Sequence, residues 1–296
     1  MSFATLLLPD FLLILLGFIL LRVTHWGAAF WSGAEKLVYY VLFPALLFHA
    51  TARAPLDFAS TGKLVQAAML TLGCGIALGW LAKPLFRPGH MIFESGVQTA
   101  FRFNSYIALA AASRLAGDAG TALMGLIIGF SVPVTNAAAV HALTHKDGKL
   151  WQELARNPLL VATAVGLVFN FAGLHIPDVL GATLARLGNA SIALGLILVG
   201  AGLRLSGLHE AKGIATWFIA VKLLALPAIA WAAGRWLGLS LLQLQIVVMF
   251  GALPTASSAF VLAARMGGNG PFVAFLISAG TLLSIVTLPM WLALVS

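Results

Sequence analysis

The chain has 296 residues, of which 61% are hydrophobic and only 9% are charged, and its formal net charge is +8. Roughly a quarter of the residues of soluble domains are charged. This composition and a mean hydropathy of +1.01 therefore exclude a soluble protein and indicate an integral membrane protein. The basic residues occur in ones, twos and threes at the ends of apolar stretches, which is typical of membrane topology and not of nucleic-acid binding.

Apolar windows of spanning length predict ten transmembrane helices, because about 20 residues cross a bilayer. The predicted spans cover residues 4–22, 34–50, 64–83, 91–114, 121–143, 157–175, 183–203, 213–234, 241–265 and 271–295. We interpret the first as a retained helix and not as a signal peptide, because Pro9 and Asp10 interrupt it and no basic segment precedes it. The expected fold class is an all-α integral membrane protein with a single membrane domain.

The loops predict the orientation, since cytoplasmic loops are enriched in Lys and Arg. One side has ten such residues and the other has five. The first set is Arg22, Lys36, Lys83, Arg87, Lys146, Lys149, Arg156, Arg204, Lys212 and Arg265; the second is Arg53, Lys63, Arg114, Arg186 and Arg235. We therefore expect a multi-pass protein of the cell (inner) membrane with both termini on the non-cytoplasmic side.

The basic linker His145–Arg156 divides the chain into two sets of five spans, residues 1–147 and 148–296. An odd number of spans in each half means that the second half is inserted upside down. A shift of 151 residues brings the starts of the first five spans to within about two residues of the second five. Two inverted five-helix repeats are the architecture of many secondary transporters.

The ninth span carries Pro254 at its centre, followed by Thr255, Ser257 and Ser258. Proline removes a backbone donor and clashes with the carbonyl four residues earlier, so we expect the helix to break there. Hydrocarbon cannot satisfy the polar groups that such a break releases, which are tolerated only inside protein or beside a water-filled cavity. A broken helix with hydroxyl groups at mid-depth indicates a passage for a small molecule.

The same shift places Phe103 and Asn104 of the fourth span opposite Pro254 and Thr255. Both positions lie about a dozen residues into their spans, which is roughly 18 Å at 1.5 Å per residue. That depth is close to the midplane of a 30 Å hydrocarbon core. Two breaks at one depth predict a site where the helices cross.

Five short motifs carry a resemblance to a known family: FRFNSYIAL (residues 101–109), SVPVTN (131–136), RNPLL (156–160), SIALGLILVGAGL (191–203) and ALPTASSAFVLAARMGG (252–268). The sequence resembles the bacterial type of the auxin efflux carrier family, which includes the plant PIN carriers and permeases for malonate and malate. The resemblance implies ten helices in inverted repeats with crossed broken helices, on a scaffold like that of bile acid symporters and sodium/proton antiporters. It places Asn104 and Pro254 at the two crossovers. The plant carriers have proline directly before that asparagine, whereas Phe103 stands here.

Several polar side chains are candidates for binding substrate. Arg102 could hold a carboxylate, because its guanidinium offers planar bidentate donors; alternatively it is a structural cation bonded to released carbonyls or to Glu94. Asn104 presents both a donor and an acceptor, and Ser105 lies beside it. The hydroxyl groups at the second break bind substrate or the carbonyls that Pro254 releases.

Two further candidates lie on other spans. Lys222 is the other deep cation, and the alternative is that its long stem reaches the cytoplasmic face or a neighbouring carbonyl. Asn136 either contributes to the site or joins helices across the bundle. The full candidate set for binding substrate is Arg102, Asn104, Ser105, Asn136, Lys222, Pro254, Thr255, Ser257 and Ser258.

These features predict a secondary transporter of small organic anions, such as malonate, malate or auxin-like acids, that works by alternating access as one repeat rocks against the other. The alternatives are a proton- or sodium-coupled cation exchanger on the same scaffold and a non-transporting receptor or scaffold protein. The chain has no motif of a metalloprotease, an ATP-driven pump or a serine hydrolase, so we expect no enzyme. No catalytic residue, metal or other cofactor is expected. The expected partners are the anion and the lipid bilayer, and a homodimer is left open.

Overall fold

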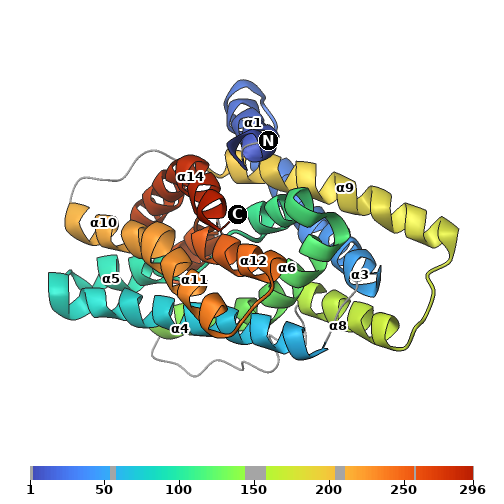
Figure 1. Ribbon diagram of the computed structural model, residues 1–296. Helices are drawn as coiled ribbons and strands as arrows, with labels where there is room; N and C mark the ends of the chain where they lie inside the picture. Colours follow the sequence, from blue (N-terminus) through green and yellow to red (C-terminus); the bar gives the residue numbers. More distant parts are fainter. Residues whose placement is uncertain (1–2, 54–57, 144–157, 204–210, 257, 296) are drawn as a thin grey trace.

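A computed structural model describes residues 3–53, 58–143, 158–203, 211–256 and 258–295, and all regular structure within these ranges is helical (Figure 1). The first part comprises α1 (Phe3–Val23), α2 (Ala28–Leu37), the π-helical turn η1 (Val38–Leu42), α3 (Phe43–Arg53), α4 (Phe58–Phe86), α5 (His90–Gly96), the 3₁₀ turn η2 (Val97–Ala100) and α6 (Ser105–Leu143). The second part comprises α8 (Pro158–Phe171), α9 (Asp178–Ala201), α10 (Lys212–Ala220), the π-helical turn η3 (Val221–Ala225), α11 (Leu226–Trp236), α12 (Leu241–Ala252), α13 (Ser258–Arg265) and α14 (Gly270–Leu294).

Five stretches among the described residues are long and apolar enough to cross a membrane. They are Thr61–Phe86, His90–Leu143, Asp178–Ala201, Lys212–Trp236 and Gly270–Leu294. Two shorter apolar helices, Val161–Phe171 and Leu241–Ala252, accompany them. The membrane class predicted from composition is therefore supported by the lengths of the helices.

The second predicted span, residues 34–50, is shorter than the helix that the structure contains. α2, η1 and α3 run without interruption from Ala28 to Arg53. The first turns of α2 mix aromatic residues with Ser32, Glu35 and Lys36, which lowers the hydropathy of the window although the helix continues.

A sharp turn divides α6 into two parts. Ala116 (φ −149°, ψ 28°) and Gly117 (φ 55°, ψ −135°) leave the helical region, and the positive φ of Gly117 is one that side chains with a Cβ rarely adopt. The first part of α6 therefore belongs to the fourth predicted span and the second part to the fifth.

The helices pack in two groups that each draw on both parts of the chain. α1 packs along α9, and α3 packs against both α8 and α9, at the upper and right-hand side of Figure 1. α11 packs against α12 and α4, and α14 contacts α12, α13 and α5, at the left. α6 contacts members of both groups. We call them the α9 group (α1, α3, α8, α9) and the α12 group (α4, α5, α11–α14).

Glycines allow α1 and α9 to approach closely. A Cβ added to Gly17 would overlap the main chain of Ile197, and one added to Gly200 would overlap the main chain of Ile14. Each helix therefore requires a glycine where it meets the backbone of the other.

Both π-helical turns come two residues before a proline. In η1 the Phe43 amide bonds to the Val38 carbonyl, ahead of Pro44, and in η3 the Leu226 amide bonds to the Val221 carbonyl, ahead of Pro227. Proline has no amide hydrogen to continue the helical ladder, so the turn before it widens. At the second site the Leu223 carbonyl, which would face the missing donor, accepts from Trp291 Nε1 at 3.0 Å.

Candidate functional site

Two helix breaks meet at the centre of the protein. η2 ends at Ala100 and α6 begins at Ser105; α12 ends at Ala252 and α13 begins at Ser258. The backbone amide of Asn104 in the first break donates to the Pro254 carbonyl in the second at 2.8 Å. The predicted interruption at Pro254 is confirmed, and the first break is present without a proline at Phe103.

Asn104 makes the first break by capping the helix that follows it. Its Oδ1 accepts from the backbone amides of Tyr106 at 3.0 Å and Ile107 at 3.2 Å. Asparagine is one of the preferred N-cap residues, because its side chain satisfies amides that have no partner within the helix. Phe103 packs edge-on against Phe250 of α12, with ring centroids 4.8 Å apart. An apolar contact and a cap thus take the place of proline here.

Polar groups of the second break form hydrogen bonds with groups of the first break. Leu253 is extended (φ −60°, ψ 140°), as expected for the residue before a proline. Thr255 Oγ1 donates to the Thr99 carbonyl at 2.7 Å, so this hydroxyl caps the end of η2. Gln98 Nε2 donates to the Ala259 carbonyl at 3.3 Å from the opposite direction. The sequence left open substrate or a carbonyl released by Pro254 as the partner of Thr255, and the carbonyl to which Thr255 bonds in the structure belongs to the first break.

Arg102 lies at the junction and is only 8% exposed. Its Nη1 donates to Gln98 Oε1 at 3.3 Å, and its Nη2 donates to Asn136 Oδ1 and Ser258 Oγ, both at 3.0 Å. These three side-chain partners are uncharged. Glu94, the alternative partner considered from the sequence, lies 3.7 Å from His90 instead. The guanidinium is therefore held in place by neutral acceptors and keeps its positive charge available to a ligand.

The side-chain nitrogen of Asn104, Nδ2, is a second hydrogen-bond donor at the crossing. Asn104 is 1% exposed, and its Nδ2 has no hydrogen-bond partner among the residues that the structure describes. Buried polar atoms without a partner are uncommon and costly. Because Oδ1 already serves the cap, Nδ2 is the atom of Asn104 that can bind an acceptor on a solute.

Lys222 has a different environment from the one expected of a substrate ligand. It lies in η3 at 3% exposure, and its Nζ donates to the Gly251 carbonyl at 3.1 Å. Gly251 is in the last turn of α12, where the carbonyls carry the partial negative charge of the helix dipole. The structure thus contains the alternative considered from the sequence, contact with a neighbouring carbonyl.

The structure brings together six of the nine predicted residues. At the crossing, Arg102 bonds to Asn136 and Ser258, Asn104 bonds to Pro254, and Thr255 bonds to the Thr99 carbonyl. Ser105 is half-buried in the first turn of α6, Lys222 contacts the end of α12, and Ser257 lies outside the described residues. Asn136 joins α6 to the crossing through Arg102, so it connects elements of the site as well as belonging to it.

Gln98 is a site residue that the sequence reasoning missed. It is fully buried, and its amide group bonds to Arg102, to the Ala259 carbonyl and to the Ser95 carbonyl. The signal that could have found it is a glutamine four residues before Arg102, one helical turn away on the same face.

The N-termini of two helices point toward the crossing. α6 begins at Ser105 and α13 at Ser258, next to the Arg102 guanidinium. Helix N-termini carry partial positive charge and favour anions. The negative end of α12 is met by the Lys222 ammonium. The arrangement therefore provides a positive environment suited to a carboxylate.

Comparison with known proteins gives consistent matches. The sequence profile of a family described as "Membrane transport protein" matches residues 144–292. An uncharacterized transporter of Methanothermobacter thermautotrophicus is 26% identical over 292 residues, which cover 94% of this chain and 94% of that protein. The "Putative malonate transporter" of Rhizobium meliloti is 25% identical, covering 95% of this chain and 92% of its own. The uncharacterized transporter YfdV of Escherichia coli (strain K12) is 25% identical, covering 97% and 95%.

Proposed function

Because the chain belongs to the membrane transport protein family, which is the auxin efflux carrier family, we propose that it is a secondary carrier of small organic anions that works by alternating access. The family and these relatives are transporters and not enzymes. The substrate class that we propose is mono- and dicarboxylates, such as malonate, malate or auxin-like acids. The name of the Rhizobium relative supports this class.

The observation that carries the proposal is the pair of donors at the crossing. The Arg102 guanidinium is buried among neutral partners, and Asn104 Nδ2 is buried without an acceptor. A carboxylate accepts hydrogen bonds at both of its oxygens and would satisfy both groups. A cation would leave the amide donor unsatisfied and be repelled by the guanidinium, which disfavours a sodium- or proton-coupled cation exchanger.

We further propose that residues 1–147 and 148–296 form two inverted repeats of five spans each, with both termini on the non-cytoplasmic side of the cell membrane. The positions of the breaks support the repeat. The gap at residues 101–104 shifted by 151 falls on residues 252–255, and α12 ends at Ala252. Inversion would place the two breaks at one depth, as carriers with crossed broken helices require.

The packing favours one kind of motion over another. The α9 group contains α1 and α3 from the first half and α8 and α9 from the second, so neither half is a separate body. We propose that access alternates through movement of the α12 group with the crossing against the α9 group, and not through rocking of one repeat against the other.

The test is carboxylate exchange in proteoliposomes that contain the full-length protein. Vesicles loaded with unlabelled malonate, malate or indole-3-acetate would be given the labelled acid outside, and counterflow would be compared for the wild type and Arg102→Gln. Loss of a charge-assisted contact worth about 1.5–3 kcal/mol predicts a decrease in affinity of roughly 10- to 100-fold.

Arg186→Gln is the matched control, because it removes the same charge from an exposed position on α9. We expect it to match the wild type. Equal counterflow for the two variants would overturn the role of Arg102, and no counterflow of any carboxylate by the wild type would overturn the proposed function.

A further inference from the structure

A charged pair lies within the bundle, outside the crossing. Asp10 of α1 is buried and not solvated. Its side chain is 8% exposed, and its Oδ1 accepts from Arg114 Nε of α6 at 3.2 Å. The residues are 104 positions apart in the sequence, and their contact joins the α9 group to the helix that starts at the crossing.

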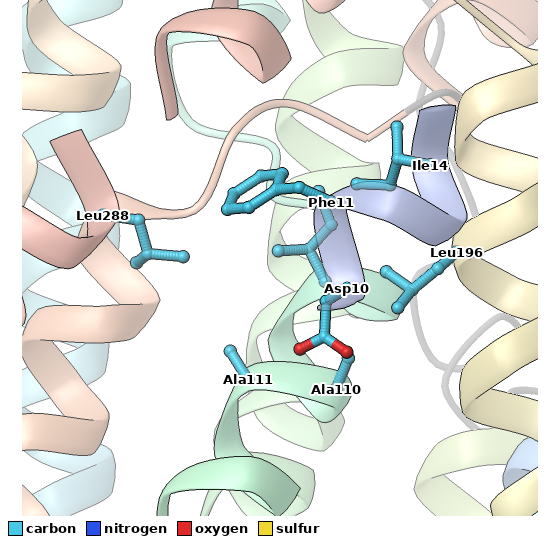
Figure 2. Close-up of a pocket in the computed structure, with 8 residues that line it drawn as sticks. Asp10, Phe11, Ile14, Ala110, Ala111, Leu196 and Leu288 are labelled. Atoms are coloured by element: carbon cyan, nitrogen blue, oxygen red, sulfur yellow. The ribbon is translucent and has the colours of Figure 1, made fainter. Parts of the chain in front are cut away.

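Asp10 lines a narrow pocket between α1, α6, α9 and α14 (Figure 2). Its carboxylate is directed from α1 toward Ala110 and Ala111 of α6, while Leu196 of α9 and Leu288 of α14 form other walls. Asp10 is the one polar residue among the described residues that line this pocket. No second acid is therefore present in the pocket to share its charge.

The pocket adjoins the crossing. Ile107, another of its lining residues, donates its backbone amide to Asn104 Oδ1, so the pocket wall begins one helical turn beyond the first break. Arg114 lies two further turns along α6, on the side that the loop charges predict to be non-cytoplasmic. The pair thus stands between the crossing and the outer surface.

One carboxylate oxygen of Asp10 is left without a partner. Oδ2 is buried and accepts no hydrogen bond from any residue that the structure describes. A buried charged oxygen without a donor is costly, and such a group requires an explanation. A proton on Oδ2 would remove the charge and convert this oxygen from an acceptor without a donor into a hydroxyl.

Arg114 has hydrogen-bond donors that Asp10 does not use. Its side chain is 42% exposed, and only its Nε is engaged; within the described part of the chain neither terminal nitrogen has a hydrogen-bond partner. Its terminal nitrogens can therefore bind the carboxylate of a solute, but its single positive charge can neutralise only one buried carboxylate at a time.

We propose that Asp10 is a proton-binding site through which a proton and a carboxylate are carried together, as solute and Asp10 compete for Arg114. The inference rests on the proposed function and supplies its coupling. Addition of a proton to the Asp10 carboxylate gives a neutral acid and frees the Arg114 guanidinium, which then binds the carboxylate of the solute at a place distinct from the crossing. One proton accompanies each carboxylate that replaces Asp10.

The charges balance in both states. Before exchange, Asp10 and Arg114 sum to zero; afterwards, neutral Asp10 stands beside Arg114 paired with the solute carboxylate, which again sums to zero. Neither state buries an uncompensated charge, which would be strongly unfavourable. From α6 the charged group facing Asp10 is Arg114, and from α9 and α14 the described pocket residues are Leu196 and Leu288, both uncharged.

The first experiment measures protons directly. Malonate would be added to purified protein in a weakly buffered solution that contains a pH indicator. We expect uptake of about one proton per bound malonate by the wild type and by Asp178→Asn, the same change at an exposed position on α9. Asp10→Asn, which mimics the protonated side chain, should take up none.

The second experiment uses proteoliposomes and compares two rates in the same vesicles: counterflow at equal pH, and accumulation driven by an acidic exterior. For Asp10→Asn we expect the ratio of accumulation to counterflow to fall at least tenfold relative to Asp178→Asn. This ratio cancels differences in the amount of folded protein. Arg114→Gln should raise the outer concentration for half-maximal counterflow by about tenfold.

The outcomes separate the two proposals. Absence of counterflow in the wild type contradicts the proposed function. Counterflow without proton uptake, or a ratio for Asp10→Asn equal to that for Asp178→Asn, overturns the role of Asp10 and leaves the carrier function standing.

Discussion

The backbone amide of Asn104 donates to the Pro254 carbonyl at 2.8 Å, so each broken helix supplies a hydrogen-bond partner that the other lacks. In an unbroken helix that amide would bond four residues back and that carbonyl four residues ahead. The crossing is therefore a shared backbone structure as well as a meeting of side chains, and changes on one break affect the other.

Replacement of Asn104 by aspartate or by alanine separates its two roles. Aspartate keeps an oxygen to cap α6 but replaces the Nδ2 donor with a negatively charged acceptor. We expect Asn104→Asp to melt near the wild-type temperature in detergent and to lose at least tenfold in malonate affinity. Asn104→Ala should lose affinity and also about 1 kcal/mol of stability, because the cap is removed. Wild-type affinity in Asn104→Asp would exclude Nδ2 as a ligand.

The hydroxyl of Thr255 is expected to stabilise the crossing. Thr255→Val removes the donor to the Thr99 carbonyl, which is 2.7 Å away, and leaves that buried carbonyl unpaired. The expected cost is about 1–3 kcal/mol, measured by thermal unfolding in detergent. Thr255→Ser keeps the hydroxyl and should lose much less. Equal destabilisation by both changes would assign the effect to the lost methyl group.

Lys222→Met tests whether the buried ammonium serves the fold or the solute. Methionine has a similar length but no donor, so the Gly251 carbonyl would lose its 3.1 Å partner at the end of α12. We expect a fall in melting temperature corresponding to about 1–3 kcal/mol, with malonate affinity changed less than about twofold. Lys212→Met, at an exposed position on α10, is the control. A tenfold loss of affinity at unchanged stability would instead place Lys222 in the binding site.

The close contact of α1 and α9 predicts the effect of one methyl group. Gly200→Ala places a Cβ against the main chain of Ile14, which cannot move without displacing the helix. Overpacking of this kind costs about 1–3 kcal/mol, so the melting temperature in detergent should fall. Gly73→Ala, on α4, meets nothing within 4 Å and should leave the melting temperature unchanged or raise it. Similar melting curves for the two variants would show that the helices do not need this approach.

The sequence predicted the features that depend on local chemistry. Hydropathy indicated an all-helical membrane protein, and Pro254 marked the second break because a missing amide hydrogen acts on its own helix. The first break was located by the 151-residue shift, and the resemblance placed Asn104 there, although not as a helix cap. A cap competes with helix continuation only when the surrounding structure favours it.

Contacts between distant helices could not be predicted in the same way. The pairing of Asp10 with Arg114 and the contacts of Gln98 depend on the rotation of each helix about its axis. A shift of one residue along the helix changes the direction of the side chain by about 100°. Strong hydropathy all around a membrane helix leaves no amphipathic pattern from which to read which face is turned inward.

The wide turn η3 ahead of Pro227 rotates α11 about its axis by a fixed angle. Accommodating one extra residue turns everything downstream by about 100° relative to a regular helix. Pro227 has no amide hydrogen to restore the regular hydrogen-bond pattern, and the Leu223 carbonyl accepts from the Trp291 indole instead. The wide turn therefore stays at this position in the helix. The face that α11 turns toward α12 and α4 is consequently fixed before any solute arrives.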